Sequence, residues 1–240
     1  GRPGAVRGEL DLDMLRTLDH TGLLDGVDRA VVWDVPLTTR FRGLTRRDGV
    51  LVHGPAGWGE VAPFWDHGAE AAAMWLAAGL ESAVAGVSTP LLRETVPVNV
   101  TVPEVGPERA RALVAISGCT TAKVKVGGRP TSLRQDLMRL EAVRDGLGPE
   151  GKVRIDVNGA WDLDAARRNL PLMDRAAVGL EYVEQPCAAV EDLAALRREL
   201  DVPIAADESI RLSTDPPAVA RLEAADVAVL KVQPIGGIRA

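Results

Sequence analysis

The sequence predicts an α/β protein in which a small α+β domain precedes a (β/α) barrel. Three observations lead to this prediction. After Pro90, short apolar runs alternate with stretches of helical periodicity. The charged residues at the ends of the later runs are 23 to 31 residues apart, close to the roughly 30 residues of a βαβ unit. Before Pro90, strand-like runs are instead followed by a single alanine-rich helical stretch.

Residues 1–93 are expected to contribute an N-terminal extension (1–28) and a small α+β domain (29–93). The extension carries leucines at the spacing of a short amphipathic helix. In the domain, β-branched runs bounded by Gly and Pro indicate antiparallel strands, and a run rich in Ala and Leu indicates a helix. The expected strands are 30–37, 49–54 and 57–64, and the expected helix is 67–85. A polar connection, TTRFRGLTRRD, separates the first two strands.

Residues 94–240 are expected to form the barrel, because consecutive parallel strands with right-handed helical crossovers close most economically in that way. A doubly wound open sheet is the alternative, but no glycine-rich phosphate loop follows the first strand. The expected strands are 96–103, 122–127, 153–158, 179–186, 203–209 and 227–234. The helix between the third and fourth strands contains Pro171, which predicts a kink or a break. An eight-stranded barrel needs two more βα units, so the barrel is expected to be incomplete at its C-terminal end.

Composition and charge argue against two classes of binding partner, nucleic acid and the membrane. The net charge is −6 and basic residues form no stripe, which argues against nucleic acid. Apolar runs fall short of the ~20 residues that span a bilayer, so no membrane partner is expected. Two cysteines without metal-site or disulfide-framework spacing fit a reducing cytoplasm. The sequence does not decide between a monomer and a homo-oligomer.

Three acidic residues, Asp156, Glu184 and Asp207, end three successive expected strands. Their carboxylates would repel one another at one barrel face unless a cation lay between them. All-oxygen ligands select a hard divalent ion, so we expect Mg²⁺, with Mn²⁺ as the alternative. Asn158 shares the face of Asp156 and is expected to support the metal ligands or the substrate. Glu208 is expected to point to the opposite side.

Lys123 and Lys125 lie two residues apart on a strand, so their side chains leave the same face. Mutual repulsion is expected to lower the pKa of one of them toward the range in which it acts as a base. Lys231, on the sixth strand, is expected to lie across the barrel from Lys125. The N–H groups of Gly236 and Gly237 either contact a carboxylate or belong to an ordinary strand-to-helix turn.

With these motifs the chain resembles the enolase superfamily, in its muconate-lactonising-enzyme-like branch. The matching motifs are KVK at 123–125, DVNG at 156–159, EQP at 184–186, DES at 207–209 and KVQPIGG at 231–237. Within that branch, the N-terminal runs at 36–43 and 57–64 are similar to those of actinobacterial o-succinylbenzoate synthases.

The resemblance implies a Mg²⁺-dependent hydro-lyase with the three acidic residues as metal ligands. Lys125 is implied to be the base that removes an α-proton and returns it to the departing hydroxyl. Lys123 is implied to tune Lys125 or to touch the substrate carboxylate, and Lys231 to stabilise the intermediate from the other face. The implied reaction is the syn-dehydration of a succinyl-hydroxycyclohexadiene carboxylate to o-succinylbenzoate, in menaquinone biosynthesis.

The resemblance also implies that the small domain caps the barrel mouth. Arg40 and Arg42 are candidates to bind the succinyl carboxylate, and a solvated hairpin loop is the alternative for both. Alternatives for the activity within the branch are an N-acylamino-acid racemase, a dipeptide epimerase and a muconate cycloisomerase. An alternative from a different class is a non-catalytic barrel fragment that binds a metal or a partner.

Overall fold

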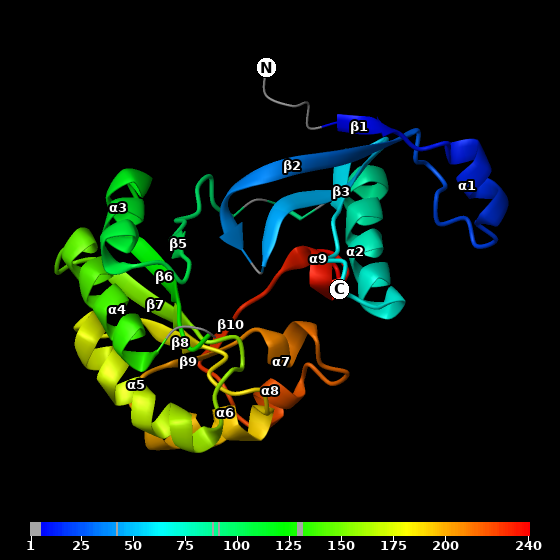
Figure 1. The fold of residues 1–240 in the computed structure, drawn as a ribbon. Coiled ribbons are helices and arrows are strands. Elements are labelled where there is room, and N and C mark those ends of the chain that lie inside the picture. Colours follow the sequence, from blue (N-terminus) through cyan, green and yellow to red (C-terminus); the bar gives the residue numbers. More distant parts are fainter. Residues whose placement is uncertain (1–5, 42, 88, 91, 129–131) are drawn as a thin grey trace. The chain divides into compact units, whose positions relative to one another are not determined.

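The computed structural model describes residues 6–41, 43–87, 89–90, 92–128 and 132–240. The chain divides into two compact units (Figure 1). The first comprises Gly1–Leu92 together with Lys231–Ala240, and the second is Arg93–Leu230. None of the helices in the described ranges is both long enough and apolar enough to cross a membrane.

The first unit is built on an antiparallel sheet in the order β1-β2-β3-β4. Its strands are β1 (Val6–Glu9), β2 (Arg29–Phe41), β3 (Leu44–Gly54) and β4 (Gly57–Val61). The β2–β3 ladder continues through most of the arginine-rich segment that was predicted to be a connection, and it pairs Val35 with Arg47 and Pro36 with Arg46. Antiparallel pairing tolerates a polar, solvated face, so this segment is strand although it lacks apolar alternation.

Helices complete the first unit: α1 (Leu12–Leu18), α2 (Ala69–Leu80) with its π-helical end η1 (Glu81–Ala85), and α9 (Val232–Ile235). The predicted N-terminal extension is part of this unit, because β1 pairs with β2. Helix α2 approaches β4 through two glycines, since a Cβ on Gly59 would lie only 1.9 Å from the carbonyl oxygen of Gly79. The C-terminal segment joins the same unit, where the Glu81 carboxylate accepts from Ile238 N and Arg239 Nε.

The second unit contains a six-stranded sheet in the order β10-β9-β8-β7-β6-β5, with every described neighbouring pair parallel. This arrangement agrees with the predicted fold class. Its strands are β5 (Val100–Val102), β6 (Thr121–Lys125), β7 (Lys152–Asp156), β8 (Tyr182–Glu184), β9 (Ile204–Ala206) and β10 (Val227–Ala228).

Four helices alternate with these strands and cover the outer face of the sheet (Figure 1): α3 (Pro107–Ser117), α4 (Leu133–Leu147), α5 (Leu163–Ala177) and α6 (Val190–Glu199). Ser132 and Gln135 cap the start of α4 reciprocally, as a capping box does. The core between helices and sheet includes the fully buried side chains of Leu140, Ile155, Leu170, Met173, Leu193 and Ile204.

The structure differs from two predictions for residues 94–240. The predicted break at Pro171 is absent, because α5 runs through this residue, whose side chain is exposed. The sixth strand is much shorter than predicted, and it is followed by α9. Lys231 is therefore not a strand residue but the N-cap residue of α9. Pro234 lacks an N–H and cannot donate to a ladder, yet it is tolerated in a helix's first turn.

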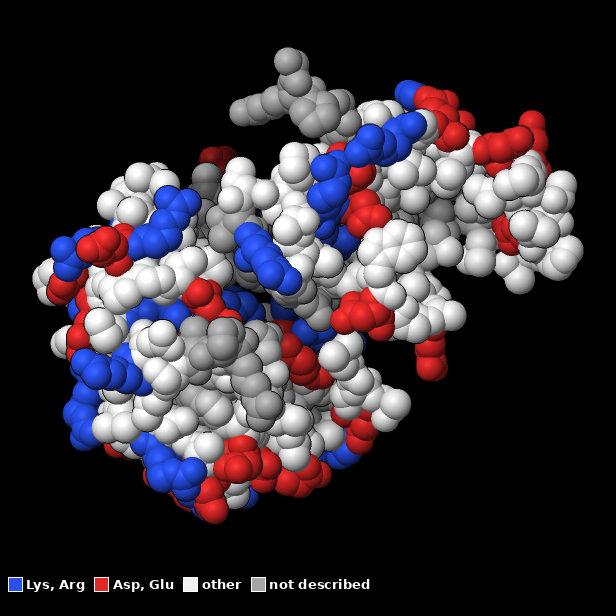
Figure 2. All heavy atoms as spheres, viewed as in Figure 1, with Lys and Arg blue, Asp and Glu red and all other residues white. Residues whose placement is uncertain are grey.

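Two short helices, α7 (Glu208–Arg211) and α8 (Ala218–Arg221), follow β9. Pro216 and Pro217 precede α8, and residues before proline avoid the helical region. On the face of the molecule in Figure 2, acidic side chains lie beside basic ones rather than in separate fields.

Candidate functional site

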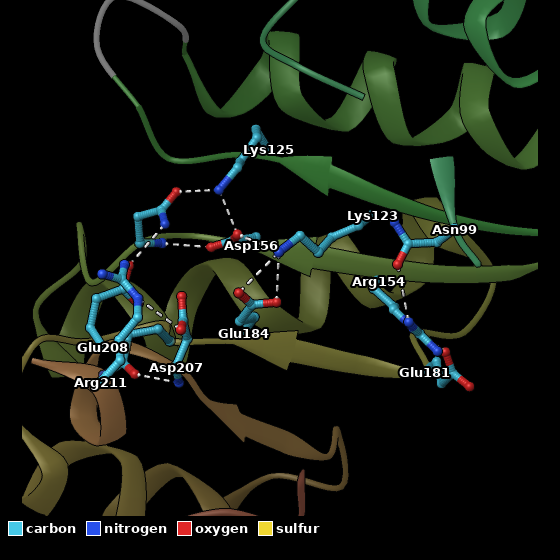
Figure 3. A network of polar contacts seen from close by, with 12 residues as sticks. Asn99, Lys123, Lys125, Arg154, Asp156, Glu181, Glu184, Asp207, Glu208 and Arg211 are labelled. Carbon is cyan, nitrogen blue, oxygen red and sulfur yellow. Dashed lines mark hydrogen bonds and ion pairs between the residues drawn. The ribbon is translucent and has the colours of Figure 1, made fainter. Parts of the chain in front are cut away.

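The carboxyl ends of four neighbouring strands carry the predicted charged residues of the second unit (Figure 3). Register aligns Lys125 on β6 with Asp156 on β7, and Asp156 with Glu184 on β8. Asp207 follows β9 directly. Strands that run parallel present their carboxyl ends on one side, so the register brings these residues into one row.

Lys123 connects two of the predicted metal ligands. Its Nζ lies 2.9 Å from Asp156 Oδ2 and 2.9 Å from Glu184 Oε2, with a further hydrogen bond to Glu184 Oε1 at 3.0 Å. Both carboxylates are only 1% exposed. One ammonium group therefore compensates two acidic groups that are almost completely removed from water.

Lys125 leaves the same face of β6 as Lys123, as predicted. Its Nζ donates to Asp156 Oδ2 at 2.5 Å and to Asn158 Oδ1 at 2.7 Å. Asn158 also donates its backbone N–H to Asp156 Oδ1 at 3.1 Å. Two acceptors from β7 and the residues after it therefore hold the ammonium group of Lys125 in place.

Glu208 and Arg211 extend this set toward β9. Glu208 Oε1 accepts from Asn158 Nδ2 at 3.0 Å and from Arg211 Nη2 at 2.8 Å. Arg211 Nε donates to Asp207 Oδ1 at 2.9 Å. Glu208 therefore does not point away from the site as predicted, because the turn of α7 that begins after Asp207 directs it toward Asn158.

These residues form a continuous group that we call the strand-end network: Lys123, Lys125, Asp156, Asn158, Glu184, Asp207, Glu208 and Arg211. Arg211 was not among the predicted site residues. Its only signal was a position four residues after Asp207, which places two side chains on one helical face. A cavity of about 410 Å³ borders the network and is lined in part by Asn158, Glu208 and Ser209.

Burial and neighbouring charges both shift the pKa values of the ionisable groups in the network. Burial raises the pKa of Glu184 to about 7, and the nearby charge of Asp156 adds to this effect. Burial also opposes ionisation of Asp156, but Lys123 and Lys125 outweigh it and lower the pKa of that carboxyl. At Lys123, burial disfavours the charged form, yet Asp156 and Glu184 prevail and raise its pKa. The lowered lysine pKa predicted from mutual repulsion is therefore not found at Lys123.

Other predicted site residues lie in the first unit. Gly236 N donates to Gln233 O and Gly237 N to Val232 O, so both groups close the C-terminal end of α9. Arg40 is exposed and donates from Nε to the carbonyl of Gly43 in the β2–β3 turn. Arg42 lies outside the described residues.

A metal site can be tested against the donor atoms of the network. In the described ranges, no three His, Cys, Asp or Glu side chains are grouped so that they could hold a metal ion; the carboxylates of Asp156, Glu184 and Asp207 are paired with cationic side chains instead. Their chemistry nevertheless fits a hard divalent cation, which prefers carboxylate oxygens. All three are at most 1% exposed and end adjacent strands.

Comparison with known proteins decides the family. The model of the enolase C-terminal domain-like family matches residues 107–240, which is more than half of the chain. The chain belongs to the enolase superfamily. The enolase N-terminal domain-like model matches residues 32–83 in the first unit. The resemblance inferred from the motifs is thus confirmed, and so is the predicted fold class.

Three members of the superfamily illustrate the relationship. An o-succinylbenzoate synthase of Thermobifida fusca is 61% identical over 206 residues, which are 86% of this chain and 64% of that enzyme. The chain therefore spans less than two thirds of this relative's length. An o-succinylbenzoate synthase structure from Thermosynechococcus elongatus, complexed with Mg, is 25% identical with a TM-score of 0.54, covering 75% of this chain and 68% of the other.

Muconate lactonizing enzyme from Pseudomonas putida shares the fold, with a TM-score of 0.71 at 23% identity over 89% of this chain and 74% of the other. The candidates to hold a divalent cation in this chain are the three buried carboxylates at the ends of β7, β8 and β9.

Proposed function

We propose that the protein is a Mg²⁺-dependent o-succinylbenzoate synthase, a hydro-lyase acting on a small carboxylate in cytoplasmic menaquinone biosynthesis. One observation carries the proposal: a lysine pair on β6 faces buried carboxylates at the next strand ends, in a chain 61% identical to a synthase of this name. Such a lysine pair offers a base, and the carboxylates offer oxygen ligands for a divalent cation.

The two lysines are proposed to have different tasks. Lys123 bridges two carboxylates and its pKa is raised, so it stays protonated and serves as a fixed positive charge. Lys125 Nζ has contacts to Asp156 and Asn158 that orient it. Lys125, in its neutral form, is therefore proposed as the base that removes the α-proton.

The proposed reaction moves one proton from the α-carbon of the substrate to its departing hydroxyl group. Lys125 Nζ takes the α-proton of the substrate, and the electron pair left behind is delocalised onto the substrate carboxylate. A bound Mg²⁺ would supply Lewis-acid stabilisation of that negative charge. The same ammonium group then protonates the departing hydroxyl on the same face, water leaves, and the ring becomes aromatic. Asp156, Glu184 and Asp207 are proposed as the metal ligands.

The roles of the other candidate residues are proposals as well. Lys231 is proposed to stabilise the intermediate, and Arg40 and Arg42 are candidates for the succinyl carboxylate. Asn158 is proposed to support both Lys125 and the metal ligands, because it contacts Lys125 Nζ and Asp156 Oδ1.

An activity assay tests the proposal. The purified protein should dehydrate the succinyl-hydroxycyclohexadiene carboxylate when Mg²⁺ is present, lose this activity when a chelator is added, and recover it when Mg²⁺ is restored. The same preparation should be assayed for racemisation of N-acylamino acids and epimerisation of dipeptides. Racemisation without dehydration would overturn the proposal in favour of another activity of the branch.

A further inference from the structure

Gln185 is the residue directly after Glu184, and its side chain is completely buried. Its Nε2 donates to the carbonyl oxygen of Cys187 at 2.9 Å and to Ser209 Oγ at 2.6 Å. Its Oε1 accepts from the backbone N–H groups of Asp207 at 3.0 Å and Ser209 at 3.1 Å. A side-chain amide has two N–H donors and two acceptor sites, so every one of them is used.

The backbone of Gln185 joins two further elements. Its N–H donates to Ala205 O on β9 at 2.8 Å, and its carbonyl oxygen accepts from Gly159 N at 2.7 Å. The residue has a φ of 42°, a left-handed conformation that non-glycine residues adopt rarely and that persists only where the surroundings fix it. One residue therefore ties together the chain after β7, the end of β8 and the end of β9.

These contacts point to a role in the site that no comparison assigns. We infer that Gln185 is a positioning residue for the metal ligands, which fixes Asp207 through its backbone N–H and Glu184 through the chain. The inference rests on the proposed function, because it presupposes that these carboxylates hold a divalent cation. Residues that orient metal ligands without touching the metal commonly change its affinity by about 10- to 100-fold when replaced.

Gln185 suits this role because of its chemistry. An amide does not titrate, so its four hydrogen bonds are the same at every working pH. A carboxylate in its place would put a further negative charge next to Asp207, and it could not donate to Cys187 O. The alternative is that Gln185 only contributes to stability. The two roles differ in one observable, which is metal affinity in a protein that is still folded.

Mn²⁺ binding measured by electron paramagnetic resonance of the free ion tests the inference without any turnover. The variant is Gln185→Met, which keeps the length of the side chain and removes all four hydrogen bonds. The control is Leu193→Ala on α6, because Leu193 is fully buried and packs in the core without contacting the strand ends through hydrogen bonds. Thermal melts show how much stability each variant loses.

The expected result is a Kd for Mn²⁺ that rises about 10- to 100-fold in Gln185→Met and stays within about twofold of wild type in Leu193→Ala, as for a distant independent site. If Gln185→Met does not fold, Gln185→Asn replaces it; this variant keeps the amide, tolerates a positive φ and is one methylene too short. An unchanged Kd in the folded variant overturns the inference alone. A wild-type protein without saturable Mn²⁺ binding overturns the proposed function as well, and it is measured first.

Discussion

Lys123 Nζ lies 2.9 Å from both Asp156 Oδ2 and Glu184 Oε2, so one ammonium group joins the ends of β7 and β8. All three side chains are largely removed from water, with exposures of 16%, 1% and 1%. The strength of such a bridge depends on both partners being present, because a buried charge that loses its partner is strongly destabilising.

Replacing Lys123 by Met should therefore lower the free energy of unfolding in metal-free buffer by about 3–5 kcal/mol. Mg²⁺ should then raise the melting temperature more in Lys123→Met than in wild type, because the unpaired carboxylates gain a counter-ion. Urea denaturation in metal-free buffer measures the first effect, and differential scanning fluorimetry with and without Mg²⁺ measures the second. An equal shift in the two proteins would show that the metal does not bind where Lys123 bridges.

Replacing Lys125 by Ala should abolish dehydration while the fold is retained. The proposed base is lost, and general base catalysis contributes about 10²- to 10⁴-fold to the rate. The matched control is Lys152→Ala, which removes a lysine from the opposite, exposed end of β7, where it pairs with Glu181. Activity of Lys125→Ala near that of wild type would refute the assignment of the base.

Removal of divalent metal should lower the melting temperature without unfolding the protein. A ligand that binds only the folded state at 100 times its Kd adds about 2.7 kcal/mol of stability, and a chelator removes this contribution. The check is a series of melts in which the Mg²⁺ concentration is varied. A melting temperature independent of Mg²⁺ would contradict a metal site in the strand-end network.

Asp226 should make stability depend on pH in the acidic range. Burial opposes its ionisation, but hydrogen bonds from Ile204 N and Arg197 Nε prevail and lower its pKa below the usual 3.8. A carboxyl with a depressed folded-state pKa stabilises the fold above its unfolded pKa, and this stabilisation is lost as the pH falls through the folded value. Urea unfolding of wild type and Asp226→Asn should thus differ near neutrality and converge below the folded pKa. A difference that persists undiminished in acid would contradict this account.

Arg139 and Asp136 form a buried ion pair within α4, each with 2% of its side chain exposed. Arg139 also donates to the carbonyl oxygens of Lys125 and Val105. Arg139→Met should therefore destabilise the protein by about 3–5 kcal/mol. Arg167→Met, which breaks an exposed pair with Glu199, should have little effect on chemical denaturation. A similar loss of stability in the two variants would show that the buried ion pair contributes no more to stability than the exposed pair.

The strands predicted from the sequence overlap β6, β7, β8 and β9, and the predicted charged residues lie at or next to the ends of these strands. In each of these strands, β-branched or small apolar residues are buried in the core, alone in β9 and beside charged or aromatic residues in the others, and such short runs carry their signal locally. The placement of Asp156, Glu184 and Asp207 at successive strand ends followed from where the apolar runs end in the sequence. The contacts between them did not, because they depend on how neighbouring strands align.

Other features of the structure were not predicted, because they depend on contacts between residues far apart in the sequence. The β2–β3 hairpin continues through an arginine-rich segment because cross-strand pairing does not require apolar side chains. Arg211 and Glu208 belong to a single helical turn, which is too short for periodicity to reveal. In the sequence, Gln185 appeared only as the middle residue of the EQP motif. Its four side-chain hydrogen bonds were not predicted, because they involve residues up to 24 positions away.

The strand-end network brings three cationic side chains to four carboxylates, so the chain supplies most of its own counter-ions. Domains whose ligands repel one another until a metal arrives fold only in its presence. We infer that the strand ends need no metal to assemble, because their carboxylates already have cationic partners. At the proposed metal site, loading with Mg²⁺ would then be an exchange of counter-ions, in which the lysine that bridges Asp156 and Glu184 gives up its place to the ion.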